Sequence, residues 1–316
     1  MHSETISSPP ASGAGRAFPE SKADRRLPWG AAAGWCGLGA LALLGRWSEL
    51  ALWVAAVVLV GGHEAGHALA ARRCGYAVPR VVIGCGPTIV GFRIGPTAVR
   101  LGLLPVFGLA DIDTVDDDTD HPLRSALVYL AGPLASLALG FVLIFGALVG
   151  PGIDAASPVS AARAASEVTV RSAGAVWAAP YHWVNGAIRR FVDPEPSRSA
   201  GGEGRERPTG DDGDPRLVSA VGIAAEVSRS GDDLGIRGGL FLTGGVSAGI
   251  AGFNLLPVWG LDGFGILEAC VRGLRRRHRG IGRFASRALV ATGILMAVVA
   301  VGLITFTVGR DLAALV

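Results

Sequence analysis

The sequence predicts an α-helical polytopic membrane protein with about five transmembrane helices and a small membrane-associated β-loop after the second of them. Half of the 316 residues are hydrophobic and only 17% are charged, whereas soluble domains carry about 25% charged residues. The mean hydropathy is +0.44. The apolar residues are also gathered in runs, and a helix that crosses a bilayer needs about 20 of them. Composition and clustering together exclude an ordinary soluble fold.

The predicted spans follow a polar N-terminus. Residues 1–27 are rich in Ser, Pro and Ala, and we expect them to form a disordered cytoplasmic tail. Apolar runs then recur along the chain, and the first is short and rich in Ala and Gly. They divide the remainder into N-terminal spans with the β-loop (28–149), an extracytoplasmic segment (150–236) and C-terminal spans (237–316). The five predicted spans are residues 28–45, 50–71, 123–149, 240–256 and 284–308.

Basic residues beside the spans predict the orientation, because cytoplasmic loops of membrane proteins carry an excess of Lys and Arg. With a cytoplasmic N-terminus and five crossings, three basic clusters fall on the cytoplasmic side. We therefore expect a multi-pass protein of the plasma membrane. The clusters are Arg16, Lys22, Arg25 and Arg26 before the first span, Arg72 and Arg73 after the second, and Arg272, Arg275, Arg276, Arg277, Arg279 and Arg283 in the loop before the fifth.

Three stretches between the spans differ in character. Residues 75–113 alternate short β-prone runs with Gly and Pro, a pattern typical of hairpins. They are apolar enough to lie against the membrane beside protein surfaces. Residues 158–192 have helical periodicity and several aromatic residues, which suits an amphipathic helix at the membrane interface. Residues 193–214 are rich in Pro, Gly and charged residues and predict a flexible linker.

A candidate metal-binding motif lies in the second span, within the predicted active-site helix 50–73. His63 and His67 are four residues apart, so a helix places both imidazoles on one face, where they can bind one zinc ion. Glu64 is suited to act as general base toward water. A charged residue in a span costs at least about 2.5 kcal/mol, which favours a functional role. The alternative is a polar patch in which His and Glu satisfy one another.

A catalytic zinc ion needs a third protein ligand, and Asp262 is the candidate. It lies at the predicted cytoplasmic end of the fourth span. There Pro257, Gly260 and Gly263 interrupt the helix, so that backbone and side chains can line a polar cavity. The alternative is that Asp262 caps the helix that follows.

With both motifs on one chain, the sequence resembles the site-2 protease family of intramembrane zinc metalloproteases. That family has HExxH in one core span and an Asn-x-x-Pro-x-x-x-x-Asp-Gly-type sequence in a later one. Here the second motif contains Asn254, Pro257 and Asp262. The loop after the active-site helix resembles the family's membrane-associated β-loop. The resemblance covers roughly residues 50–310.

The resemblance implies roles for individual residues. His63, His67 and Asp262 would bind Zn²⁺, and Glu64 would be the catalytic base. In the family Asn often stands three residues after a Gly-Pro pair in the next span, but this chain has Ser136 there, a departure from the pattern. The substrate-binding residues that the resemblance implies are Asn254, Pro257, Gly132 and Pro133.

The implied activity is cleavage of a transmembrane segment in a single-span membrane-protein substrate. Regulated intramembrane proteolysis of an anti-sigma factor is one example. A substrate helix must unwind before it is cut, and an edge of the β-loop can pair with the resulting strand. Many bacterial members of the family insert PDZ domains. Residues 150–236 lack the strands of such a domain, so we predict none.

Two other classes of function compete with this one. A non-catalytic zinc-binding membrane scaffold would gain nothing from a general base at Glu64. A metal or proton transporter would usually have broken helices in two related halves, and this sequence shows a single break and no repeat. We expect the lipid bilayer as a partner and no nucleic acid, because the net charge is only +3. Four scattered cysteines argue against a cysteine zinc site.

Overall fold

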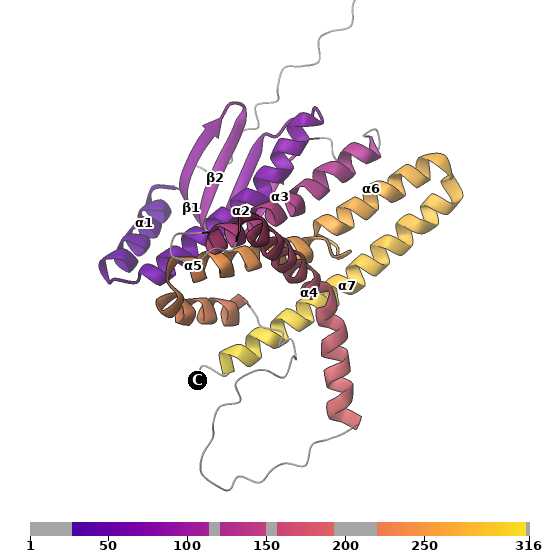
Figure 1. Cartoon of the computed structure of the whole chain (residues 1–316). Helices are drawn as coiled ribbons and strands as arrows, with labels where there is room; N and C mark the ends of the chain where they lie inside the picture. The colour runs from indigo at the N-terminus through magenta and orange to yellow at the C-terminus, as the bar shows by residue number, and fades with distance from the viewer. Residues whose placement is uncertain (1–26, 114–120, 150–156, 193–219, 314–316) are drawn as a thin grey trace, which may run out of the picture.

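Helices make up most of the computed structural model, and a two-stranded sheet lies beside them (Figure 1). The structure describes residues 27–113, 121–149, 157–192 and 220–313. The predicted tail therefore lies outside the described residues except for Leu27, and the predicted linker 193–214 lies wholly outside them. The elements are α1 (Leu27–Leu43), α2 (Trp47–Arg73), β1 (Arg80–Ile94), β2 (Thr97–Asp111), α3 (Pro122–Val149), α4 (Pro158–Val192), α5 (Ala220–Asn254), α6 (Asp262–Arg277) and α7 (Arg279–Ala313).

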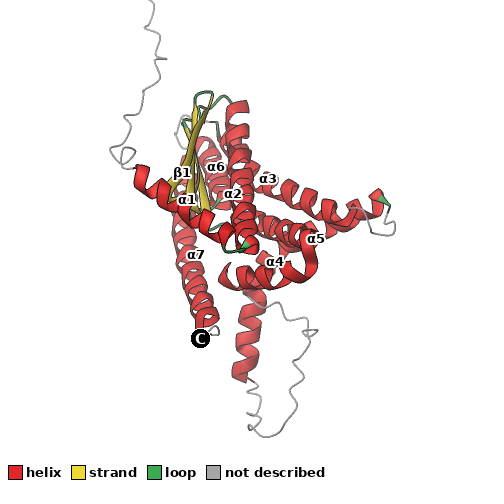
Figure 2. Cartoon of the chain, turned by 90° about the vertical axis from the view of Figure 1, so that its left-hand side faces the viewer, coloured by secondary structure: helices red, strands yellow, loops and turns green. Residues whose placement is uncertain are grey.

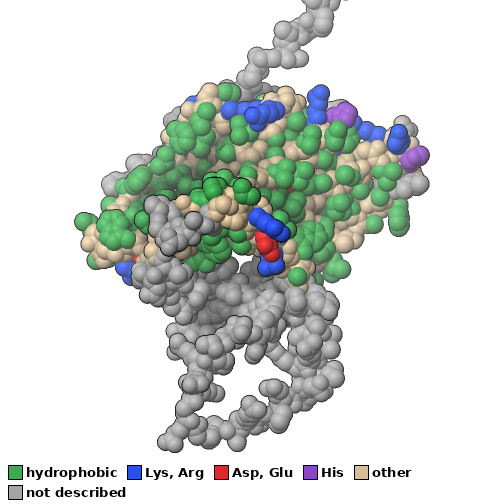
Figure 3. Space-filling model, viewed as in Figure 1, with side chains coloured by type: hydrophobic (Ala, Val, Ile, Leu, Met, Phe, Trp, Pro, Cys, Tyr) green, Lys and Arg blue, Asp and Glu red, His purple; other side chains and the backbone are tan. Residues whose placement is uncertain are grey.

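Three helices in the described part of the chain are long and apolar enough to cross a bilayer. They are α2, α3 and the Gly235–Asn254 part of α5, which correspond to the second, third and fourth predicted spans. The helices α1 and α7 contain shorter apolar stretches, Ala31–Leu43 and Phe284–Val299. The multi-span helical fold is thus confirmed, whereas a total of five spans is not. Figure 3 shows hydrophobic side chains over much of the described surface, with Lys and Arg gathered along its upper edge.

The central helix is α3, which contacts α2, α4, α5 and α6. Small residues allow these helices to approach closely. A Cβ atom on Gly66 of α2 would overlap the carbonyl oxygen of Ala131 in α3. On α5, a Cβ atom on Gly244 would lie 2.8 Å from the carbonyl oxygen of Gly140 in α3. Small residues at helix contacts are typical of membrane proteins, where van der Waals packing holds helices together.

The predicted β-loop is a folded hairpin. β1 and β2 pair antiparallel, and residues 80–83 lie between two parts of β2, so that Val82 faces both Arg100 and Leu109. This arrangement leaves residues 88–94 and 108–111 as the two outer edges of the sheet. Figure 2 shows α1 crossing in front of the sheet at β1. There the indole N–H of Trp35 donates to the carbonyl of Ile89 at 3.0 Å, so α1 contacts the first edge at Ile89, while residues 91–94 of that edge are exposed.

The segment after the fourth span differs from the prediction. The arginines from 272 onward indicated a loop between spans, but residues Asp262–Arg277 form α6, and its last turn holds Arg275, Arg276 and Arg277. This helix mixes apolar and basic residues, so a search for long apolar runs does not find it. α6 and α7 lie side by side in Figure 1 and contact each other. These arginines therefore lie between the fourth and fifth predicted spans, in helices and not in an irregular loop.

The helices on either side of residues 193–219 agree in position with predicted segments, and the structure adds their packing and full length. α4 covers the predicted amphipathic segment 158–192, and its first half packs on α3 and α5 with Ala161 and Ala165 buried. The indole N–H of Trp177 donates to the carbonyl of Gly252 at 3.1 Å. α5 begins well before the predicted fourth span and has a kink at Gly235, where φ is 59°. Glycine adopts this left-handed φ without a steric penalty.

Candidate active site

The HExxH residues lie in the middle of the bundle. His63, Glu64 and His67 are each only 6% exposed, and all three belong to α2. The four-residue spacing of the two histidines places their imidazoles on one face of α2, as predicted, and this face packs on α3. Three polar residues are thus buried within one candidate membrane span, where they need polar partners.

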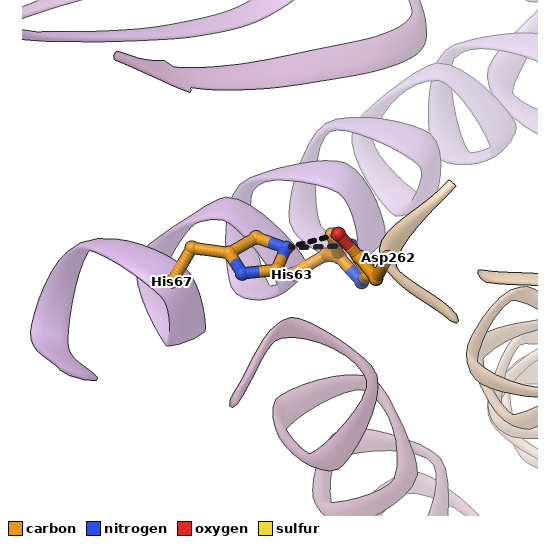
Figure 4. Close-up of side chains that lie close together, drawn as sticks. All are labelled: His63, His67 and Asp262. Carbon is orange, nitrogen blue, oxygen red and sulfur yellow. Dashed lines mark hydrogen bonds and ion pairs between the residues drawn. The ribbon is translucent and has the colours of Figure 1, made fainter. Parts of the chain in front are cut away.

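The third predicted ligand reaches the same point from a distant part of the sequence. Asp262 Oδ2 lies 3.0 Å from His63 Nε2, and Asp262 Oδ1 lies 3.2 Å from His67 Nε2. The two Nε2 atoms are 3.2 Å apart. Figure 4 shows the two imidazoles on α2 and the Asp262 carboxylate approaching from α6. One ligand atom from each residue lies within 4.8 Å of the others.

A break between α5 and α6 places Asp262 beside the two histidines. α5 ends at Asn254, a non-helical turn follows, and Asp262 is the first residue of α6. Gly260 in this turn has φ of +92°, a conformation that favours glycine. A Cβ atom on Gly263 would overlap the carbonyl oxygen of Leu255. The residue after Asp262 must therefore be glycine, since it packs directly against the backbone of the turn.

The second nitrogen of each imidazole also has a partner. Nδ1 of His67 lies 2.8 Å from the carbonyl oxygen of Val128, and Nδ1 of His63 lies 2.9 Å from the hydroxyl oxygen of Ser136. A carbonyl oxygen can only accept, so Nδ1 of His67 carries a hydrogen, which leaves Nε2 as the nitrogen that can bind a metal. Such contacts are the usual way in which proteins orient histidines that bind metals.

The arrangement of these atoms fits a zinc ion. Without a cation, the lone pair of a neutral Nε2 would face the negative oxygens of Asp262, which is unfavourable. In a tetrahedral site with bonds of about 2.0–2.1 Å, ligand atoms are about 3.3 Å apart, close to the 3.0–3.2 Å between these atoms. Two imidazoles and one carboxylate are also a known ligand set for catalytic zinc, and they leave a fourth position open.

Glu64 does not belong to the group of metal ligands and lies against β2 instead. A Cβ atom on Gly108 would overlap the Glu64 carboxyl group, and the backbone of Ala110 forms a hydrogen bond with Glu64. Both residues lie in the outer edge 108–111 of the sheet. The acid that could move a proton is therefore next to the strand edge and next to the metal ligands.

The four predicted substrate-binding residues lie in two places. Asn254 ends α5 and its side-chain amide donates to the carbonyl of Ile250 at 3.0 Å; Pro257 is half-buried in the turn that follows. Gly132 and Pro133 are buried in α3, and Gly132 lies directly against the His67 ring. Their role in binding substrate stays a prediction.

Sequence reasoning missed four residues that contact the site, which are Val128, Ser136, Gly108 and Ala110. Val128 acts through a backbone carbonyl, which no side-chain pattern reveals. Ser136 was noted only as a departure from the family pattern, although its four-residue spacing from Gly132 places it on the face of α3 that meets α2. Gly108 could not be recognised without knowing that the β-loop folds over Glu64.

A bundle of membrane-spanning helices that carries HExxH and a third carboxylate ligand defines a membrane metallopeptidase. Comparison with protein families agrees. The family model described as Peptidase family M50 matches residues 51–300. The chain therefore belongs to peptidase family M50, the site-2 protease family of zinc metalloproteases, and zinc is the metal expected at this site.

Individual relatives named as zinc metalloproteases match shorter segments of the chain. Zinc metalloprotease Rip1 of Mycobacterium tuberculosis is 33% identical over 105 residues, which cover 29% of this chain and 26% of the relative. NMA0084 of Neisseria meningitidis, whose name includes the words zinc metalloprotease, is 32% identical over 121 residues, covering 34% of this chain and 27% of the relative. The matched segment thus spans about a quarter of each of these proteins.

Proposed function

We propose that this chain is an intramembrane zinc endopeptidase that hydrolyses a peptide bond within the transmembrane segment of a single-span membrane protein. The observation that carries the proposal is the position of Glu64. It is buried in a candidate span, next in sequence to His63 and in contact with the β2 edge. A structural zinc site or a scaffold has no use for a carboxylate at this position, whereas hydrolysis requires a base there.

The roles of the residues follow from this geometry. His63, His67 and Asp262 hold the zinc ion, which when bound polarises the substrate carbonyl and makes water a nucleophile at neutral pH. Glu64 takes the proton from the attacking water and passes it to the leaving amine. The buried position of Glu64 keeps bulk water away from this proton, and the backbone of Ala110 orients its carboxylate.

The outer edge of β2 could bind the substrate as an additional strand. A transmembrane helix must unwind before its carbonyl groups can react, and an extended strand can add to a sheet edge. The edge formed by residues 88–94 is contacted by α1 at Ile89, whereas residues 108–111 lie beside Glu64, where a paired strand would meet the base. Exposed apolar side chains near this second edge, Val106, Phe107 and Leu109, suit an apolar substrate strand. We assign Asn254 and Pro257 to contacts with the side of the substrate strand that faces away from β2. Gly132 and Pro133 would shape the substrate-binding site.

The positions of the basic residues support a cytoplasmic N-terminus and an active site near the cytoplasmic side. Arg72 and Arg73 end α2, and Arg275–Arg277 end α6. Five crossings remain part of this proposal. Cleavage near the cytoplasmic side would release the cytoplasmic part of a substrate, as regulated proteolysis of an anti-sigma factor requires.

The proposal is tested in proteoliposomes that contain the chain and a candidate single-span substrate. The Glu64→Gln variant removes the base and retains a side chain of the same size. We expect it to keep zinc and to lose cleavage by at least about 100-fold, the lower range of a general base. The matched control is Glu167→Gln, the same change at an exposed residue of α4 that pairs with Arg171. Unchanged cleavage by zinc-loaded Glu64→Gln would refute the proposal.

A further inference from the structure

One face of α3 contacts both metal-binding histidines. Val128, Gly132 and Ser136 are spaced by four residues and lie on this face. The first two contact His67, through the Val128 carbonyl and through the close approach of Gly132. The hydroxyl of Ser136 lies 2.9 Å from His63 Nδ1. Ser136 is 1% exposed, so no bulk water competes for this hydrogen bond.

The two histidines have different partners at Nδ1. An imidazole that binds metal through Nε2 must carry its hydrogen on Nδ1, and the partner of Nδ1 decides whether it does. For His67 that partner is a main-chain carbonyl, which mutation of a side chain does not remove. For His63 the partner is the hydroxyl of Ser136. A helical serine can turn its own hydrogen to the carbonyl one turn earlier, which leaves its lone pairs for an imidazole N–H.

We propose that Ser136 is a positioning residue that holds His63 with its hydrogen on Nδ1 and its Nε2 toward the metal. It acts through His63 and touches neither metal nor substrate. The departure from the family pattern at this position is thus a ligand-orienting serine in this chain. The inference rests on the zinc site of the proposed function and not on peptide cleavage.

The packing around Ser136 offers a matched control. Its carbonyl oxygen accepts a hydrogen bond from the hydroxyl of Ser247 in α5 at 2.8 Å. Ser247 is fully buried in the same contact between α3 and α5, so Ser247→Ala deletes an equally buried hydroxyl. That hydroxyl bonds to main chain and not to an imidazole. A comparison of the two serines therefore separates ligand orientation from general packing.

The test measures zinc affinity by competition with a chromogenic chelator, using the full-length chain in detergent. Removal of a residue that orients a metal ligand typically lowers affinity 10- to 100-fold. We expect that loss for Ser136→Ala, while Ser247→Ala and Ser136→Thr, which keeps the hydroxyl, stay within about threefold of wild type. The d–d spectrum of the Co²⁺-substituted chain should change in Ser136→Ala alone.

Three results would overturn the inference: full zinc affinity in Ser136→Ala, an equal loss in Ser247→Ala, or a loss in Ser136→Thr as large as in Ser136→Ala. The last two would show that packing governs the site. Because no step requires cleavage, a chain that bound zinc and cut nothing would contradict the proposed function and leave this test intact.

Discussion

Gly132 of α3 lies directly against the imidazole of His67, so that a Cβ atom at this position would overlap Nε2 and the adjoining ring carbons. The second metal ligand is therefore positioned by the absence of a side chain on the neighbouring helix. Since α2 and α3 are both packed within the bundle, neither can easily move to make room.

Gly132→Ala should displace His67 and lower zinc affinity by at least tenfold, with a matching loss of cleavage. Metal content after dialysis against a weak chelator measures the effect. Gly146→Ala is the control, because Gly146 lies in the same helix and its Cβ atom would meet nothing within 4 Å. That change should leave zinc binding intact and slightly stabilise α3, since Ala favours helix over Gly. Equal zinc content in both variants would contradict the packing described for His67.

Gly108→Ala should separate metal binding from catalysis. The three atoms nearest to the added methyl group would all belong to the side chain of Glu64. We expect wild-type zinc content together with a drop in cleavage rate of about 10-fold or more, because small misplacement of a catalytic group is costly. Gly91→Ala in β1 is the control, since the nearest atom to its Cβ would lie 4.0 Å away. Loss of zinc from Gly108→Ala would show that Glu64 and the ligands respond as one unit.

Zinc should stabilise the folded chain. The ligand atoms of His63, His67 and Asp262 lie close together in the folded chain, so a metal ion that binds them adds its binding free energy to the folded state. At a free zinc concentration of 100 Kd, linkage predicts about 2.7 kcal/mol of added stability. Thermal unfolding in detergent with and without chelator measures this as a shift in Tm. The shift should vanish in Asp262→Ala; a shift of wild-type size in that variant would remove Asp262 from the ligand set.

Trp53→Phe should loosen the sheet where it meets α2. The indole N–H of Trp53 donates to the carbonyl of Leu103 at 2.7 Å, while Phe keeps the ring and loses the donor. The net cost of such a bond is about 0.5–1.5 kcal/mol. Hydrogen exchange of the β2 amides should therefore become about 2- to 13-fold faster under conditions in which exchange follows the opening equilibrium. Trp47→Phe, at a 63% exposed residue of the same helix, should have no effect on these amides.

Much of the site could be predicted because its chemistry depends on side-chain types and on their spacing in the sequence. His63 and His67 need only a helix to share a face, and Asp262 stands in a break marked by Pro257 and Gly260. The β-loop was also predictable, since alternation of β-prone runs with Gly and Pro is local in sequence. The structure adds the folding of that loop over Glu64.

The remainder depends on contacts between distant segments. The Ser136 contact with His63 joins residues 73 positions apart, and the Val128 contact uses a backbone atom that every residue possesses. A helix after Asp262 was only one of two alternatives, because the apolar residues of α6 are interrupted by charged residues, which a test for membrane spans rejects. The number of spans is equally hard to predict, since α1 and α7 contain apolar stretches shorter than a bilayer requires.

The most direct test of the central claim is the position of the cut bond. Purified chain and a single-span substrate are reconstituted together in H₂¹⁸O, and the products are mapped by mass spectrometry. We predict one cleavage site within the apolar transmembrane segment, with ¹⁸O in the new carboxyl terminus. The Glu64→Gln variant, with its zinc retained, should give neither product. Cleavage confined to the polar flanks of the substrate, or the same products from zinc-loaded Glu64→Gln, would contradict the account.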